Sequence, residues 1–433
     1  VCAVVGFGDD VHFLAHDGLC FPVHQQTRQA MAGDNMKTYI VVTPFFPTPD
    51  SYRGCFVLDA VKALKRNSDY RVEVFVPYQP GKPQPEYEVD GITVHRFPML
   101  QMPSYFFNGF SNGLNGRLFV KALEKAGIKP SDVSVCHAHT SVFGALALAL
   151  KRKNPKIKTL LQHHDLDPYT IRNGKLASWL PNLYYRASAA RKVAEKIDLH
   201  VCISKAVERN LRHFPELNPQ IHFEPYNSKL RKLKRFRTPA IKASGVLYNG
   251  VNTAVFNASG RTGHDGFRIG CIANFQDLKD YSSLLKALKL LRDKGIDFQA
   301  ELVGSGGELQ GCKTFVEDNG MQNMVTFVAE MPHDKLADFY RSLDLFVLPS
   351  AFEGLGCVYT EAWSCGTPFI ACQGQGIADY IYPEDAHLWL AKPGDYKDLA
   401  AKIEYYIQNR QQQRLCHPVD IDVLMKAFIQ KLQ

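Results

Sequence analysis

The sequence holds eleven cysteines but lacks any pair arranged for a disulfide framework or a structural metal site. No C-x-x-C spacing occurs. Cys136 and Cys271, for example, lie singly in apolar runs, where a free thiol behaves as a small hydrophobic side chain. An odd and scattered set of cysteines is typical of a reducing compartment. The sequence therefore predicts a cytoplasmic protein.

Long apolar runs are also missing. The longest, such as Ala145 to Leu150, are far shorter than the roughly 20 residues that cross a bilayer. With 45% hydrophobic and 22% charged residues the composition is that of a globular chain. Since 433 residues exceed what one ordinary core holds, we expect two domains of about 150–200 residues each.

Positive charge is clustered rather than spread. The net charge is +8, and Lys229 to Arg237 contains six basic residues in nine, with a second group between Lys151 and Lys158. Neither group is interleaved with aromatic residues in a nucleic-acid module, so no nucleic acid is predicted as a partner. Two interpretations stay open. The groups are either solvated faces or contacts to an anionic membrane surface, which would make the protein peripheral on the inner face of the cell membrane.

The first 35 residues differ from the rest. The stretch that starts at Met36 (MKTYIVVTPFF) resembles a bacterial N-terminus that opens on a strand. The preceding residues lack the basic and apolar regions of a signal peptide. We interpret residues 1–35 as an upstream mis-start or a poorly ordered extension and assign them no function.

Short apolar, strand-like runs alternate with helical stretches from Tyr39 onward. After the first run, Gly54 opens a predicted helix at Cys55 to Arg66. The strands predicted in this part are Tyr39 to Phe45, Arg71 to Pro77, Asp132 to His139, Lys158 to Asp165 and Asp198 to Ser204. Alternation of this kind indicates parallel βαβ units.

The alternation restarts after a break between Pro215 and Gly266. The second set of predicted strands is Phe267 to Ala273, Asp297 to Gly304, Met324 to Glu330, Leu343 to Pro349 and Thr367 to Gln373, with helices at Tyr281 to Lys294 and Leu336 to Ser342. We therefore predict an α/β fold of two Rossmann-like domains that face each other across a cleft. Their boundaries are 36–250 and 251–415, and a C-terminal helix in 416–433 is predicted to pack back on the first domain. Ligands of such sheets bind at the carboxyl ends of the strands.

The most informative motif is Glu353 and Glu361 with Gly354-Leu355-Gly356 between them. It follows a predicted strand and runs into a helix. Glycines at a helix start let backbone N–H groups approach an anion. Because eight helical positions span about 12 Å, we do not interpret the two carboxylates as an acid/base pair on one bond. They suit two hydroxyl groups of one extended ligand, and the whole motif suits a nucleotide-sugar.

Other candidates also follow predicted strands. Lys279 lies where its charge can reach a diphosphate. His164, beside Asp165, is the histidine that we expect to face substrate. A metal held by histidines such as His137 and His139 is an alternative, although no ligand spacing supports it. The glycines at 304–307 lack the last glycine of a dinucleotide fingerprint, so an NAD site is weakly supported.

From Met36 to about residue 415 the chain resembles the family 4 glycosyltransferases of the GT-B fold. The similar segments are TPFFPTPDSYRG, DVSVCHAHT, HHDLDP, VCISKAVERNL, VLYNGVNTAVF and, almost continuously, VTFVAEMPHDKLADFYRSLDLFVLPSAFEGLGCVYTEAWSCGTPFIA with its E-x7-E motif. Single segments are weak signals, whereas the last is highly specific.

The resemblance implies a role for each matching residue. Lys279 and Gly354, Leu355 and Gly356 would bind the donor diphosphate. Glu361 would bind the ribose, Glu353 the hydroxyls of the transferred sugar, and His164 would lie near that sugar. Gly54 would stand where donor phosphate and acceptor meet. Asn274 stands where the family often has an arginine, so diphosphate neutralisation would rest on Lys279 with help from elsewhere.

The resemblance also implies a retaining, metal-independent transferase with no cofactor. Its donor would be a nucleotide-sugar and its acceptor a glycan or a lipid-linked molecule, as in bacterial cell-surface polysaccharide biosynthesis. Two alternatives stay open. One is a nucleotide-sugar 2-epimerase with the same two domains, and the other is a non-enzymatic two-lobed sugar-binding protein.

Overall fold

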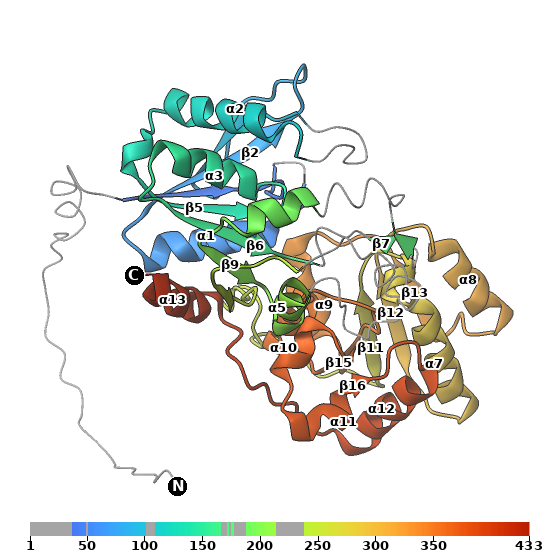
Figure 1. Cartoon of the computed structure of the whole chain (residues 1–433). Helices are drawn as coiled ribbons and strands as arrows, with labels where there is room; N and C mark the ends of the chain where they lie inside the picture. The colour runs from blue at the N-terminus through green and yellow to red at the C-terminus, as the bar shows by residue number, and fades with distance from the viewer. Residues whose placement is uncertain are drawn as a thin grey trace, which may run out of the picture. The chain divides into compact units, whose positions relative to one another are not determined.

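A computed structural model describes residues 37–48, 51–100, 109–165, 171–172, 175–176, 188–213 and 238–432. Residues 1–35 and the basic stretch Lys229 to Arg237 lie outside the described residues, so the predictions made for them are not tested. Two sheets organise the described part (Figure 1), one formed before residue 250 and one after it. We call the parts built on them the N-terminal lobe and the C-terminal lobe.

The N-terminal sheet has the strand order β10-β9-β6-β5-β1-β2-β4-β3. All its neighbours are parallel except the antiparallel pair β3 and β4. Its strands are β1 (Thr38–Val42), β2 (Arg71–Tyr78), β3 (Tyr87–Val89), β4 (Ile92–Pro98), β5 (Val133–His139), β6 (Lys158–His163), β9 (Leu199–Cys202) and β10 (Ser244–Val246). The predicted parallel βαβ arrangement is confirmed, whereas the β3–β4 hairpin at the edge was not predicted.

Side chains of one strand show how this lobe is layered. Tyr39 and Val41 of β1 join one buried cluster, and Ile40 and Val42 join another. Successive side chains of a strand point to opposite faces, so both faces of the sheet must be covered. Helices α2 (Asn112–Lys125) and α3 (Gly144–Lys153) cover one face, and α1 (Cys55–Asn67) with α13 (Ile421–Leu432) covers the other (Figure 1). Helix α5 (Lys205–Arg212) follows β9.

The C-terminal sheet has the order β13-β12-β11-β14-β15-β16, and all its neighbours are parallel. Its strands are β11 (Arg268–Ile272), β12 (Gln299–Val303), β13 (Val325–Val328), β14 (Leu345–Val347), β15 (Phe369–Cys372) and β16 (Leu390–Ala391). The accompanying helices are α7 (Tyr281–Asp293), α8 (Leu309–Asp318), α9 (Leu336–Arg341), α10 (Cys357–Ser364), α11 (Ala386–Trp389) and α12 (Tyr396–Asn409). The predicted elements are present and mostly one to three residues shorter at their ends. A short antiparallel pair, β7 (Ile171–Arg172) and β8 (Lys175–Leu176), forms a separate two-stranded sheet.

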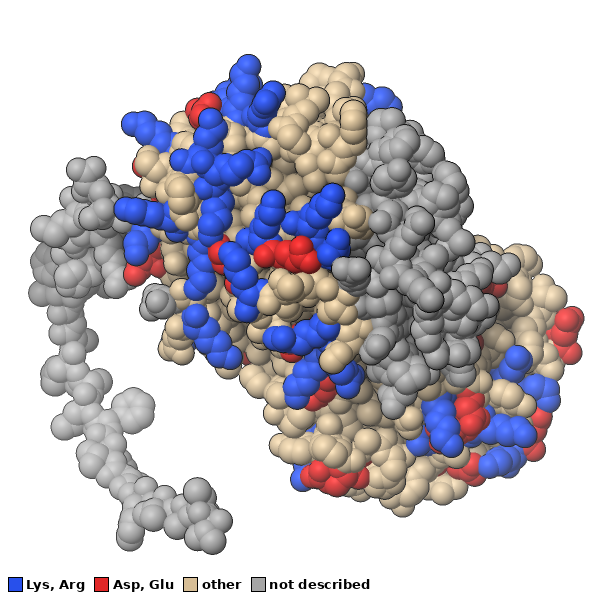
Figure 2. All heavy atoms as spheres, in the orientation of Figure 1, with Lys and Arg blue, Asp and Glu red and all other residues tan. Residues whose placement is uncertain are grey.

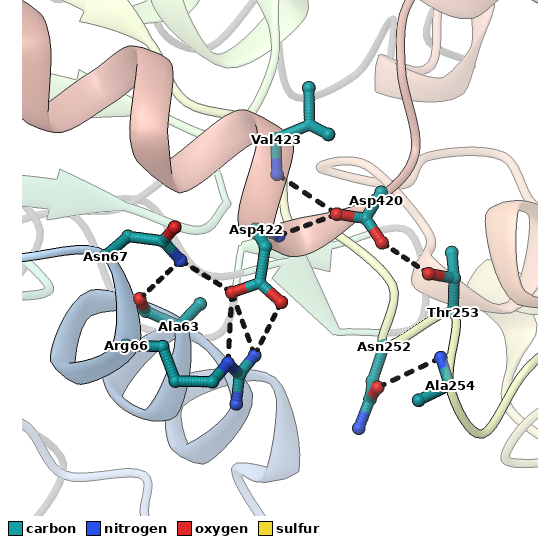
Figure 3. Close-up of polar contacts among 9 residues, drawn as sticks. All are labelled: Ala63, Arg66, Asn67, Asn252, Thr253, Ala254, Asp420, Asp422 and Val423. Carbon is teal, nitrogen blue, oxygen red and sulfur yellow. Dashed lines mark hydrogen bonds and ion pairs between the residues drawn. The ribbon is translucent and has the colours of Figure 1, made fainter. Parts of the chain in front are cut away.

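The end of the chain joins the core of the N-terminal lobe. In α13, Ile421, Met425, Ile429 and Leu432 are buried in the same cluster as β1 and α1. Asp420 begins this helix, because its carboxylate accepts hydrogen bonds from the backbone N–H groups of Asp422 and Val423, both at 3.0 Å. It also accepts the Thr253 hydroxyl, while the Asp422 carboxylate accepts Arg66 of α1 (Figure 3). Hydrogen bonds therefore connect the start of α13 to Thr253, just after residue 250, and to α1 of the N-terminal lobe.

Among the helices that the structure describes, none combines the length and the apolar character needed to cross a membrane.

Candidate functional site

The carboxyl ends of β11 and β14 carry the central pair of the candidate site. Lys279 closes a short 3-10 turn (Asp277–Lys279) after β11, and Glu353 lies in the loop after β14. Because β11 and β14 are adjacent and parallel, both loops leave the sheet at one edge. The Lys279 ammonium contacts the Glu353 carboxylate, which also accepts the Ser350 hydroxyl at 2.8 Å. Both side chains are only partly exposed. The two adjacent strands therefore place a cation and a carboxylate side by side in a partly buried position.

Gly354 brings the C-terminal lobe against the N-terminal lobe. A Cβ atom at this position would lie 2.3 Å from the carbonyl oxygen of His164, a distance that real Cβ contacts do not reach. The carbonyl oxygen of Gly354 accepts the Ser204 hydroxyl at 2.5 Å. Nearby, the backbone N–H of Lys205 donates to the Asp379 carboxylate at 2.7 Å. Glycine is required at position 354 because the backbone of this loop lies directly against the backbone of His164.

His164 follows β6 and is enclosed by rings. Its Nε2 atom is 2.9 Å from Nδ1 of His139, so one ring donates a hydrogen bond to the other. Phe56 of α1 and Phe45 of the first loop also pack on it, with ring centroids 5.2 Å and 6.3 Å away. Burial holds the pKa of His139 well below its usual range, so His139 is neutral at pH 7 and orients the His164 ring.

Glu361 has a different environment from Glu353. It lies on α10, where the Tyr340 hydroxyl of α9 donates to its Oε2 atom at 2.9 Å. Burial and, to a smaller extent, the charge of Asp59 on α1 raise the pKa of Glu361 to about 7, although the hydrogen bond from Tyr340 lowers it. The two glutamates thus have separate partners, one a cation and one a neutral hydroxyl.

The remaining predicted residues are placed as follows. Gly54 begins α1 with φ 94°, and a Cβ there would lie 2.6 Å from the backbone of Phe45, so only glycine fits. Asn274 is exposed in the loop after β11. The Leu355 side chain is buried in the core of the C-terminal lobe, which leaves only its backbone for a ligand. Gly356 begins α10.

Five histidines of the N-terminal lobe contact other histidines. The rings of His137 and His139 lie on one side of β5, with centroids 4.8 Å apart, as the strand alternation predicts. His163, by contrast, turns away from His164 to His200, at 2.9 Å between ring nitrogens. Within the described ranges, no group of three or more histidine, cysteine or acidic side chains is arranged to hold a metal ion.

Sequence reasoning missed three residues that support the site and named a fourth, His139, only as an alternative metal ligand. Ser350 and Tyr340 hold the two glutamates, Ser204 joins the lobes, and His139 contacts His164. The position of Ser350 directly after a predicted strand could have identified it as a candidate site residue. Tyr340 had none, since its neighbour in space is 21 residues away.

Two family models match this chain. Residues 256–417 match the model described as glycosyl transferases group 1, and residues 55–222 match the model described as glycosyltransferase family 4. Together they contain Lys279, Glu353, Glu361 and His164, although Gly54 lies one position before the second match.

Named relatives agree with the models. An uncharacterised glycosyltransferase of Methanocaldococcus jannaschii is 24% identical over 83% of this chain and 86% of its own. The amylovoran biosynthesis glycosyltransferase AmsK of Erwinia amylovora is 25% identical over 68% of this chain and 67% of its own. The structure of Anabaena HepE in complex with UDP has a TM-score of 0.58 and 18% identity, covering 91% of this chain and 95% of HepE. At that identity the likeness shows the fold.

Proposed function

Because this chain belongs to the glycosyltransferases of the GT-B fold, we propose that it moves a sugar from a nucleotide-sugar donor to an acceptor with retention of the anomeric configuration. The observation that carries the proposal is the Lys279–Glu353 pair at the carboxyl edge of the C-terminal sheet. This pair lies next to Gly354, whose backbone meets His164 of the other lobe. One edge thus offers a cation, a glycine-bounded helix start and a hydroxyl-binding carboxylate.

Each residue has a role that its position supports. The Lys279 ammonium and the N–H groups at the start of α10 bind the donor diphosphate, because both favour negative charge. Glu353 accepts hydroxyl groups of the transferred sugar and Glu361 those of the ribose. Lys279 and Glu353 are in contact, so the cation for the phosphates and the carboxylate for the sugar stand side by side. His164 lies at the sugar, and Gly54 permits close approach of acceptor and phosphate.

The proposed reaction is a same-face displacement. The leaving phosphate accepts the proton of the acceptor hydroxyl as the new glycosidic bond forms. Lys279 and the start of α10 stabilise the charge that develops on that phosphate. Closure of the lobes around the donor excludes water and limits donor hydrolysis. No step of this route calls for a metal or a cofactor.

A glycan or lipid-linked acceptor is the proposed partner. AmsK, the relative in Erwinia amylovora, is named for the biosynthesis of the polysaccharide amylovoran, and we propose a related role in bacterial polysaccharide biosynthesis. The matched family models and the relatives in Methanocaldococcus jannaschii and Erwinia amylovora are glycosyltransferases, which favours sugar transfer over 2-epimerisation or sugar binding alone.

A donor screen followed by product analysis tests the proposal. Thermal unfolding is measured with UDP-, GDP- and ADP-sugars, because a bound ligand raises the midpoint by mass action. The stabilising donor is then incubated with lipid-linked and glycan acceptors, and NMR assigns the product anomer. We expect one base to stabilise the protein and the product to keep the donor configuration. An inverted product would overturn retention, and stabilisation by free sugar alone would overturn the nucleotide-sugar assignment.

A further inference from the structure

Charge is divided unequally between the two lobes. Residues 37–250 contain 33 Lys and Arg against 16 Asp and Glu, whereas residues 251–433 contain 17 against 23. The net charge of the chain therefore comes from its N-terminal half. Electrostatic attraction to an anionic partner would act on one lobe and not on the other.

Much of the described positive charge lies on neighbouring helices. Helix α2 exposes Arg117, Lys121 and Lys125, which follow one another at intervals of four and so form one stripe. Helix α3 packs beside α2 and ends on Lys151, Arg152 and Lys153. The neighbouring helical residues 188–194 and the turn after them add Lys192 and Lys196. We call these eight residues the basic face; Figure 2 shows Lys and Arg gathered over α2 and α3, with few acidic side chains among them.

Few carboxylates neutralise this face. Lys151 pairs with Asp198. Among the described residues, Lys121, Lys125, Arg152 and Lys192 form no ion pair and are exposed. A set of unpaired like charges on adjacent helices repels itself, so an anionic partner would relieve that repulsion.

The basic face is hollowed and has apolar residues at its border. A cavity of about 690 Å³ opens between α2, α3 and residues 188–196. Four cations of the basic face line it together with small or apolar residues such as Ala145 and Leu148, and no described carboxylate lines it. Next to its Gly109 and Gly113, Phe110 is 88% exposed and Leu114 is 49% exposed. Exposed apolar side chains beside a cationic cavity are a combination that a membrane-contacting surface presents.

We propose that the basic face docks on a bilayer that carries anionic phospholipids. Lys and Arg are attracted to the headgroups, the cavity accepts a headgroup, and Phe110 and Leu114 enter the interface, where amphipathic surfaces bury apolar side chains. The bilayer, rather than an anionic glycan, is the partner because exposed apolar residues border the cations. Docking involves none of the residues assigned to sugar transfer. The docking proposal can therefore be tested independently of the proposed function.

Sedimentation with vesicles tests the proposal on the full chain. Vesicles of phosphatidylcholine alone are compared with vesicles that contain 30% phosphatidylglycerol. The face variant carries Lys121→Ala, Lys125→Ala, Arg152→Ala and Lys192→Ala. The control variant removes four exposed cations of the C-terminal lobe, namely Lys286→Ala, Lys294→Ala, Lys392→Ala and Lys397→Ala. Each cation near an anionic surface is worth about fivefold in affinity, so we expect at least a 50-fold loss for the face variant and less than threefold for the control.

Equal losses in the two variants, or unchanged binding of the face variant, would overturn the proposal. Thermal unfolding midpoints confirm that each variant folds. A Phe110→Trp variant adds a local readout, since its emission should shift to shorter wavelength with the anionic vesicles only. No shift would contradict insertion at this border. Transfer to a water-soluble acceptor should be unchanged in the face variant; loss of that activity with normal vesicle binding would assign the face to the acceptor.

Discussion

The two lobes share one architecture but differ in where their functional side chains lie. Each is a sheet of mainly parallel strands covered by helices. In the C-terminal lobe the candidate residues Lys279, Glu353 and Glu361 gather in loops and a helix start beyond the carboxyl ends of β11 and β14. In the N-terminal lobe, His164 lies at the equivalent edge, whereas the unpaired cations of the basic face lie on the outer helices.

This difference follows from what each lobe binds under our proposals. A small phosphorylated donor needs a few fixed groups, and parallel strands place such groups at one edge. A membrane surface is broad, and its attraction for cations adds up over many side chains without fixed geometry. A single substitution at Lys279, Glu353 or Glu361 should therefore have a strong effect. In the basic face, by contrast, only several substitutions combined should have a measurable effect.

The largest effect is expected at the Lys279–Glu353 pair. Lys279→Ala and Glu353→Ala should each lower kcat/KM for transfer at least tenfold, and about a hundredfold where the lost group stabilises developing charge. Lys286→Ala on α7 serves as the control, because this lysine is exposed in the same lobe. Initial-rate kinetics measures the change, and thermal unfolding checks the fold. Retained activity in both variants would remove this pair from the site.

A smaller loss is expected where the lobes meet. Gly354→Ala places a methyl group 2.3 Å from the carbonyl oxygen of His164 and must displace one backbone from the other. Because misplacement by about 1 Å can cost roughly a hundredfold in rate, kcat/KM should fall about 10- to 100-fold. Gly311→Ala in α8 is the matched control, since a Cβ there meets nothing within 4 Å. Equal activities of the two variants would show that this close approach is not needed.

The pKa of Glu361 in the C-terminal lobe depends partly on the N-terminal lobe, because the charge of Asp59 on α1 is one cause of its rise. The pH dependence of stability therefore reports on this contact between the lobes. A carboxylate whose pKa rises from 4.5 to about 7 on folding binds its proton more tightly in the folded state. Stability is therefore lost as pH increases from about 4.5 through 7. Glu361→Gln removes this loss, so its unfolding midpoint relative to wild type should be at least about 2 °C higher at pH 8 than at pH 5. The same difference at both pH values would contradict the raised pKa.

Asp59→Asn separates the causes of that shift. It removes the negative charge but keeps the size of the side chain, so the pKa of Glu361 should decrease while burial still holds it above its usual value. The pH dependence of the unfolding midpoint should therefore move to lower pH without disappearing. An unchanged profile would mean that burial alone sets the pKa.

Sequence periodicity predicted the sheets well and the site only in part. The runs around Tyr39 and Ile269 show apolar strands, and the glycines beside Glu353 indicate a ligand loop, because these signals are local. The antiparallel β3–β4 hairpin was missed because its strands are short and at the edge. Contacts such as Tyr340 to Glu361 or Ser204 to Gly354 join positions far apart in sequence, and no local pattern carries them. The basic face likewise depends on which helices the fold places side by side.

The smallest effect is expected where the chain returns to the N-terminal lobe. Asp420 accepts two backbone N–H groups at the start of α13, and losing such a cap costs about 1 kcal/mol. Asp420→Ala should therefore lower the unfolding midpoint by about 2–4 °C. Asp422→Asn weakens the pairing with Arg66, but both partners are more than 40% exposed. Exposed pairs contribute about 0–1 kcal/mol, so this variant should shift the midpoint less. If Asp422→Asn had the larger effect, the ion pair rather than the helix cap would hold α13 on the N-terminal lobe.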